Sequence, residues 1–206
     1  MNTQTSFLLL CLFFFVSCSK DETPPSITIL GENPFYTPLN VSYNDPGATA
    51  YDDEDGDITS YIYTEENVII SECGHYTYNY SVEDFSGNQT NETREIFVVI
   101  KNESLQGSWN VSHSCNSLIG INDIQSFDID GNDDDLVIIS DFSFLASLSL
   151  MLDDRNVTVP QQSIELGADV SGTGDINSTG DYMTLNLDFN IPVIGNESCL
   201  LVYTKQ

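Results

Sequence analysis

Apolar and polar side chains alternate with a period of two over several stretches of the chain. The clearest stretch is 183–191, in which every second residue is apolar, and another runs over 76–83. This is the period of a β-strand that buries one face. Short apolar runs rich in β-branched and aromatic residues are separated by Gly, Pro, Asn and Asp. The pattern therefore predicts an all-β protein.

The predicted strands fall into two groups. The expected strands of the first group are 26–30, 48–52, 58–64, 76–83 and 95–101, and those of the second are 136–140, 148–152, 157–159, 164–166, 170–172, 183–191 and 199–203. A polar linker is expected at 102–104. A chain of 206 residues is long enough for two domains that each bury a core. We predict a β-sandwich over 26–101 and a second antiparallel β-barrel or sandwich of about seven or eight strands over 105–206.

One face of the strand at 76–83 carries a row of tyrosines. Tyr76, Tyr78 and Tyr80 alternate with polar residues, so their rings share a side of the sheet. The row is either a platform for stacking sugars or the inward face of a central strand. The second interpretation is the one we expect.

The negative charge of the chain disfavours some classes of binding partner. Asp and Glu number 32 against 5 Lys and Arg, which gives a formal charge of -27. Nucleic acids and anionic lipid headgroups are bound through Lys and Arg clusters, so the sequence disfavours both as partners. The apolar content of 40% favours a folded chain with an acidic surface over a disordered one.

The amino terminus combines an apolar run with a cysteine. The run 7–16 is too short to span a bilayer and has the length of a signal-peptide core. The residues Phe15-Val16-Ser17-Cys18 resemble the lipobox of bacterial lipoproteins, and the following Ser-Lys-Asp-Glu resembles the surface-export signal of Bacteroidetes lipoproteins. The resemblance implies a signal peptide over 1–17, lipidation of Cys18, a tether over 18–25, and an outer-membrane protein that is lipid-anchored and exposed at the cell surface.

Five ordered motifs in the first predicted domain resemble a known family. They are Ser26-Ile27-Thr28, Asp45-Pro46-Gly47-Ala48, the acidic run 52–57, the run 74–80 and Asp84-Phe85-Ser86-Gly87-Asn88. Together they resemble the bacterial immunoglobulin-like domain of secreted and pesticidal crystal proteins, which is similar to hyalin-repeat modules. The resemblance implies an immunoglobulin-like β-sandwich that acts as a binding or spacer module without catalytic residues.

The acidic run is a candidate metal site. In an immunoglobulin-like sandwich, the loop after the strand 48–52 and the loop 84–88 lie at the same end as the start of the first strand. Carboxylates of Asp53, Asp55, Asp57 and Asp84 can therefore converge on one cation beside the tether. Carboxylate oxygens suit Ca²⁺, which we predict as the ion, and the alternative is a fully solvated turn.

The second predicted domain begins with Gly107-Ser108-Trp109, which resembles the start of lipocalin-like domains. In a closed meander the first and last strands are neighbours, which brings Cys115 and Cys199 within reach of each other. Outside the cell such a pair is oxidised. We predict a Cys115–Cys199 disulfide, and the alternative is that one of them pairs with Cys73.

The predicted function is non-catalytic. The two histidines, His75 and His113, fall in different predicted domains, and no nucleophile–base pair has local support. We expect a surface module that binds a glycan or a protein through the second domain. The alternative is a lipocalin-like carrier of a small apolar ligand, with Phe142, Phe144 and Met151 lining its interior.

Overall fold

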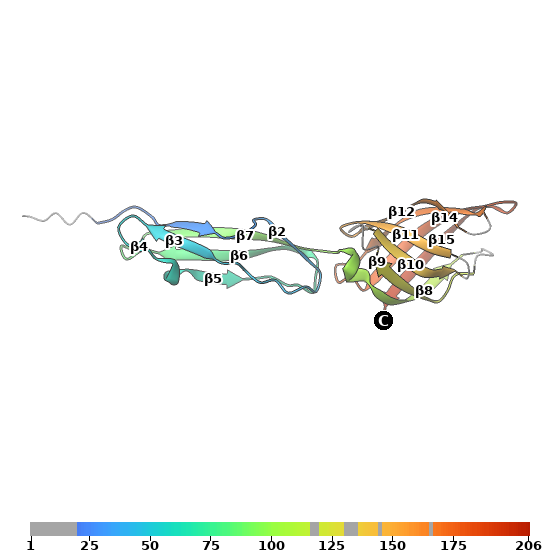
Figure 1. Cartoon of the computed structure of the whole chain (residues 1–206), viewed down its shortest axis with the longest axis horizontal. Helices are drawn as coiled ribbons and strands as arrows, with labels where there is room; N and C mark the ends of the chain where they lie inside the picture. Colours follow the sequence, from blue (N-terminus) through green and yellow to red (C-terminus); the bar gives the residue numbers. More distant parts are fainter. Residues whose placement is uncertain (1–19, 116–119, 130–135, 144–145, 165–166) are drawn as a thin grey trace, which may run out of the picture.

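The computed structural model describes residues 20–115, 120–129, 136–143, 146–164 and 167–206. Two domains built from strands lie end to end, with the short helix α1 (Asn102–Leu105) between them (Figure 1). The predicted all-β class, a sandwich followed by a barrel, is confirmed. None of the helices in the described ranges is long and apolar enough to cross a membrane.

The first domain is a sandwich of two sheets. One sheet has the order β1 (Ser26–Ile29), β3 (Ala48–Asp52), β4 (Gly56–Asp57), and the other has the order β2 (Phe35–Pro38), β7 (Gln89–Val99), β6 (Gly74–Glu83), β5 (Tyr63–Glu66). Neighbouring strands are antiparallel except β2, which runs parallel to β7. A single turn of 3-10 helix, η1 (Thr59–Tyr61), precedes β5.

The apolar core between these two sheets is small. Ala50, Ile58 and Val82 are buried, with Ile27 and Ile62 packed against them. The tyrosine row of β6 belongs to the packed part of the domain, because Tyr80 is buried and the other two rings are half-buried. A core of this size leaves much of the stabilisation to polar contacts.

A buried ion pair joins the two sheets. Arg94 in β7 is fully buried, and its Nε lies 3.0 Å from Oδ1 of Asp45, which directly precedes Pro46 and Gly47 before β3. The same guanidinium donates to the carbonyl oxygens of Leu30, at 2.6 Å, and Glu32. These bonds hold the chain between β1 and β3 against the four-stranded sheet.

The carboxylate of Asp45 is saturated with donors. It accepts hydrogen bonds from the hydroxyls of Tyr80 (2.6 Å) and Tyr43 (2.8 Å) and from the backbone N–H of Gly47 (3.0 Å). Burial, and then the hydrogen bond to Asp45, raise the pKa of Tyr80 to about 12, so this hydroxyl stays a donor at neutral pH. A buried charge pair is stable when its remaining donors and acceptors are satisfied in this way.

The second domain is a closed barrel of eight antiparallel strands in which each strand pairs with the next along the chain. The strands are β8 (Gly107–Ser114), β9 (Ile124–Ile129), β10 (Leu136–Ser143), β11 (Ala146–Asp153), β12 (Asn156–Ser163), β13 (Asp169–Ile176), β14 (Tyr182–Ile191) and β15 (Gly195–Lys205). β15 pairs with β8 and closes the barrel. The separate strands expected at 157–159 and 164–166 differ from this arrangement: β12 continues to Ser163, and 165–166 lie outside the described residues.

Side chains fill the barrel. Buried aromatic residues from five strands, Trp109, Phe127, Phe142, Phe189 and Tyr203, belong to one apolar cluster with the aliphatic residues of the other strands. An eight-stranded barrel is just wide enough for such filling. Of the three residues expected to line a ligand cavity, Phe142 is part of this packed core, Met151 is 47% exposed, and Phe144 lies outside the described residues.

The sequence pattern did not predict β9. Its inward face begins with a polar residue, Gln125, which is fully buried. The Gln125 amide donates to the carbonyl oxygens of Asn122 and Phe142, and its Oε1 accepts from the hydroxyl of Tyr203 at 3.1 Å. Tertiary hydrogen bonds therefore replace the apolar residue that alternation requires.

The domains are joined by a packed contact. Leu39, Val98 and Ile100 of the first domain and Leu105 of α1 belong to the same buried apolar cluster as the barrel interior. The backbone N–H of Cys73 donates to the carbonyl of Ser178 in the β13–β14 loop at 2.8 Å. The linker expected at 102–104 is instead helical, with Asn102 buried, because Leu105 anchors this segment in the contact.

Replacing Asp45 with alanine will destabilise the first domain strongly. The substitution leaves the guanidinium of Arg94 buried without its carboxylate, which typically costs about 3 to 5 kcal/mol in the free energy of unfolding. Denaturant unfolding of the full chain, followed by tyrosine fluorescence and circular dichroism, measures the loss.

Glu95→Ala is the matched control. Glu95 hydrogen-bonds His75 on an exposed face of the same sheet, where an ion pair contributes about 0 to 1 kcal/mol. Equal losses in the two variants would contradict the role given to the buried pair.

Candidate functional site

The acidic loops of the first domain lie at the end where the tether enters, opposite the barrel (Figure 1). The backbone N–H of Phe85 donates to Oδ2 of Asp55 at 2.8 Å. The loop after β3 and the loop after β6 therefore meet at this end, as the immunoglobulin-like arrangement implied.

Three of the four predicted ligands hold the turns of these loops. Asp55 accepts the bond from Phe85, and Oδ1 of Asp57 accepts from the backbone N–H of Thr59 at 3.0 Å. The hydrogen bonds to Thr59 lower the pKa of Asp57. Asp84 Oδ1 accepts from the backbone N–H groups of Ser86 and Asn88, at 2.9 and 2.8 Å.

Asp84 is buried, yet its carboxylate keeps its charge. Burial acts to raise its pKa, but the hydrogen bonds from Asn88, Ser86 and Gly87 outweigh this effect and leave the pKa below the usual value. Its Oδ2 also accepts from the side-chain amide of Asn88 at 2.7 Å. Asp84 is therefore the structural centre of the loop between β6 and β7.

A different set of carboxylates gathers at the tether. One oxygen from each of Asp21, Asp52 and Asp53 lies within 4.8 Å of the other two. Of the predicted four residues, only Asp53 is in this group. The motif at 52–57 pointed to Asp52 and Asp53, but the sequence held no signal for Asp21, which reaches the group from the tether.

The tether segment is docked on the domain. The side-chain amide of Asn88 donates to the carbonyl oxygens of Asp21 and Thr23, both at 3.2 Å, and the hydroxyl of Thr90 donates to the carbonyl of Pro25. Asp21 lies near the acidic loop, and its negative charge is the largest cause of the raised pKa of Glu54. Cys18, which the sequence predicts to be lipidated, lies outside the described residues.

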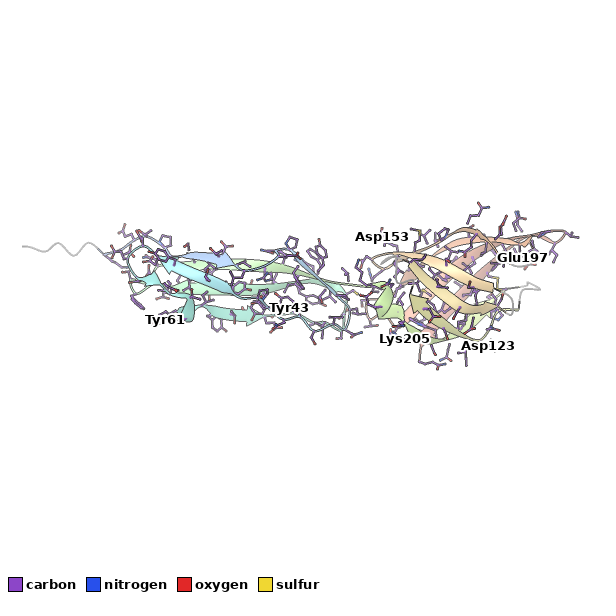
Figure 2. The ribbon with its side chains drawn as sticks, in the orientation of Figure 1. Tyr43, Tyr61, Asp123, Asp153, Glu197 and Lys205 are labelled. Carbon is purple, nitrogen blue, oxygen red and sulfur yellow. A yellow bond between two sulfur atoms is a disulfide. The ribbon has the colours of Figure 1, made fainter. Side chains whose placement is uncertain are left out.

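A second candidate site lies where the two domains meet. Two clefts of about 340 and 350 Å³ share Val99 and Asp154 as lining residues. One is lined by Cys73, Gly74, His75, Phe97, Val98, Val99, Asp154 and Arg155, and the other by Tyr36, Val99, Ile100, Lys101, Leu152, Asp153 and Asp154. Figure 2 shows Asp153 at the end of the barrel that faces the first domain.

Three aromatic rings stand beside these clefts. Tyr36, Phe97 and His75 are register neighbours on β2, β7 and β6, with ring centroids 5.1 Å apart for the first pair and 4.7 Å for the second. Tyr36 is 59% exposed because β2 is an edge strand. The row therefore ends in a tyrosine ring that a ligand can reach.

The cysteines of the second domain form the disulfide that joins the first and last strands. The Cα atoms of Cys115, which follows β8, and Cys199 in β15 are 4.7 Å apart. Cys73 is free and half-buried at the domain contact. Burial raises the pKa of its thiol to about 11, which keeps it protonated and unreactive at neutral pH.

Residues 27–98 match the family model described as Bacterial surface protein, Ig-like domain. No curated protein matches the chain. Among solved structures, a lipoprotein of Bacteroides thetaiotaomicron is similar at 16% identity and a TM-score of 0.36, with 88% of this chain and 100% of that one covered.

Two Clostridium perfringens ZmpB structures are also similar. The first contains the CBM51-2 domain in complex with GlcNAc together with INT domains, at 16% identity and a TM-score of 0.32, and covers 86% of this chain and 43% of that one. The second contains the M60 catalytic domain with the CBM51-1 and CBM51-2 domains, at 18% identity and a TM-score of 0.32, and covers 87% and 21%.

Because the carboxylate of Asp84 is charged and hydrogen-bonded in the folded state, we expect the effect of Asp84→Asn on the melting temperature to depend on pH. A carboxylate whose pKa is lower in the folded than in the unfolded state adds stability above its unfolded pKa of about 3.9, and this stability is lost as pH falls through the folded pKa. Asp84→Asn will therefore lower the melting temperature at pH 7, and the deficit will shrink as the pH approaches 3. Calorimetry across this range measures it, and a deficit that grows on acidification would contradict the assignment.

Proposed function

We propose that the chain is a lipid-anchored protein of the outer membrane, exposed at the cell surface, that binds a glycan without catalysing a reaction. The surface location is supported by the match of residues 27–98 to a bacterial surface domain family. The lipid anchor is supported by the lipobox-like residues that end at Cys18.

The observation that carries the glycan proposal is the exposed ring of Tyr36 beside the junction clefts. Pyranose rings have an apolar C–H face that packs on aromatic rings, and hydroxyls that bond to charged groups. Asp153 and Asp154 offer acceptors and Arg155 offers donors in these clefts. The cleft volumes lie at the lower end of the range of roughly 300 to 1,000 Å³ that small ligands occupy.

The clefts favour a glycan over a protein partner. A stable protein interface buries about 800 Å² on each side around an apolar centre. The junction offers two exposed rings, those of Tyr36 and His75, among charged side chains, which suits one or two sugar units better. The sequence led us to expect the recognition surface on the second domain. In this proposal the first domain contributes to it as well, because it supplies Tyr36.

The carrier alternative lacks support in the barrel. A carried apolar ligand needs interior space, and the interior is occupied by Trp109, Phe127, Phe142, Phe189 and Tyr203. Met151, expected to line the cavity, faces outward.

A glycan array probed with the purified full chain tests the proposal, and calorimetry on the best-bound glycan gives the dissociation constant. Tyr36→Ala removes the stacking ring and will weaken binding about tenfold or more, since anchor tyrosines typically contribute about 1 to 2 kcal/mol.

Tyr63→Ala is the control, because Tyr63 is 68% exposed on β5, the opposite edge of the same sheet. It will bind as the parent chain does. Failure of the parent chain to bind any glycan, or equal losses in both variants, would reject the site.

A further inference from the structure

The carboxylates of Asp21, Asp52 and Asp53 form a group of three negative charges that belongs to two separate segments. Asp52 ends β3, Asp53 follows it, and Asp21 belongs to the tether. Asp21 is 8% exposed and Asp52 is 2% exposed, whereas Asp53 lies at the surface. One oxygen of each lies within 4.8 Å of the others.

The two buried carboxylates use one oxygen each to hold the backbone. Oδ1 of Asp21 accepts from the N–H of Thr23 at 2.8 Å. Oδ1 of Asp52 accepts from the N–H groups of Glu54 and Asp55, both at 2.9 Å. Both side chains are thereby fixed in orientation.

The other oxygen of each buried carboxylate has no donor. Oδ2 of Asp21 and Oδ2 of Asp52 are buried and make no hydrogen bond within the described part of the chain. Native proteins rarely leave a buried charged atom without a partner, because nothing then compensates for its lost hydration. Two such atoms in one acidic group point to a positive ligand that approaches from the side of Oδ2.

The protein itself does not supply that charge among the residues described. Among the described residues, Arg94 forms an ion pair with Asp45 and His75 contacts Glu95, and neither contact involves this group. By contrast, the buried Asp84 at the same end has both oxygens satisfied by Asn88 and Ser86. At this end of the first domain, the buried oxygens without a partner therefore belong to Asp21 and Asp52; among the described residues, the other such carboxylate oxygen is Oε2 of Glu197, in β15 of the barrel.

We propose that Asp21, Asp52 and Asp53 bind one Ca²⁺ ion. Ca²⁺ takes carboxylate oxygens at about 2.3 to 2.6 Å, so two ligands on opposite sides of it lie up to about 5 Å apart. The oxygens of the group lie within 4.8 Å of one another, which is inside this span. Mg²⁺ dehydrates reluctantly and usually keeps several waters, so a site made of three protein carboxylates suits Ca²⁺ better.

The site joins the tether to the sandwich. Asp21 lies three residues from Cys18, and the ion links it to the end of β3 while Asn88 holds the neighbouring carbonyls. Bound Ca²⁺ therefore fixes the direction in which the chain leaves the first domain. This inference rests on the tether end and is independent of the glycan site at the junction.

Calcium titration of the purified full chain, stripped with EDTA, tests the proposal. Calorimetry will show one Ca²⁺ bound with a dissociation constant of about 0.1 to 1 mM, the range of extracellular modules. At 10 mM CaCl₂ the melting temperature of the first domain will rise by about 5 °C or more, relative to NaCl of equal ionic strength.

The variant Asp52→Asn distinguishes a loss of calcium binding from a loss of the loop's structure. The amide oxygen can still accept from Glu54 and Asp55, so the turn is retained, while the unpaired charge is removed. The variant will lose the calcium response and, without calcium, will melt no lower than the parent chain.

Asp84→Asn is the matched control, since Asp84 is equally buried but fully hydrogen-bonded. It will melt lower than the parent with and without calcium and will keep the calcium response. Three results would overturn the proposal: no calcium-dependent shift in the parent chain, an equal shift with MgCl₂, or loss of the response in Asp84→Asn but not in Asp52→Asn.

Discussion

The apolar contact between the two domains determines what the rest of the molecule can do. Leu39, Val98 and Ile100 of the sandwich belong to the same buried apolar cluster as the barrel interior, and so does Leu105 of α1. Hydrogen bonds reinforce the contact: Trp109 Nε1 donates to the carbonyl of Leu105 at 2.9 Å, and Lys205 Nζ donates to that of Ser104 at 2.8 Å. An apolar contact that is reinforced by hydrogen bonds opposes the relative motion that linked domains otherwise show. The junction clefts depend on this contact because both domains supply their walls.

Buried carboxylates have partners within the chain at one place in the first domain and lack them at another. Near its middle, the carboxylate of Asp45 is matched by the guanidinium of Arg94 and by two tyrosine hydroxyls, so a small apolar core is held together by a satisfied polar network. At the tether end, Asp21 and Asp52 bury carboxylate oxygens that nothing in the described chain neutralises. The first arrangement is complete within the chain, whereas the second depends on what the surrounding medium supplies.

The sequence predicted those features that follow from local pattern. The alternation over 183–191 predicted the strand that the structure has as β14. The expected closure of the meander predicted that Cys115 lies close to Cys199. Features that depend on tertiary contacts were missed. β9 was missed because the polar Gln125 occupies a buried position and breaks the alternation of apolar and polar residues. Asp21 was missed because it joins the acidic group through a tertiary contact, in which the tether is hydrogen-bonded to Asn88 of the loop at 84–88. Met151 was assigned to the wrong face of β11, because Leu150 and Leu152 set the phase of that strand. The junction clefts need residues from both domains, and no single stretch of sequence indicates them.

The junction clefts keep their shape only if the sandwich and the barrel move as one body. Nitrogen-15 relaxation of the full chain measures this directly, because backbone amides report the tumbling of the domain that carries them. We predict that amides of β6 and β7 and amides of β14 and β15 fit one rotational diffusion tensor, that of an elongated particle. Separate correlation times for the two domains, with faster tumbling of each, would contradict it.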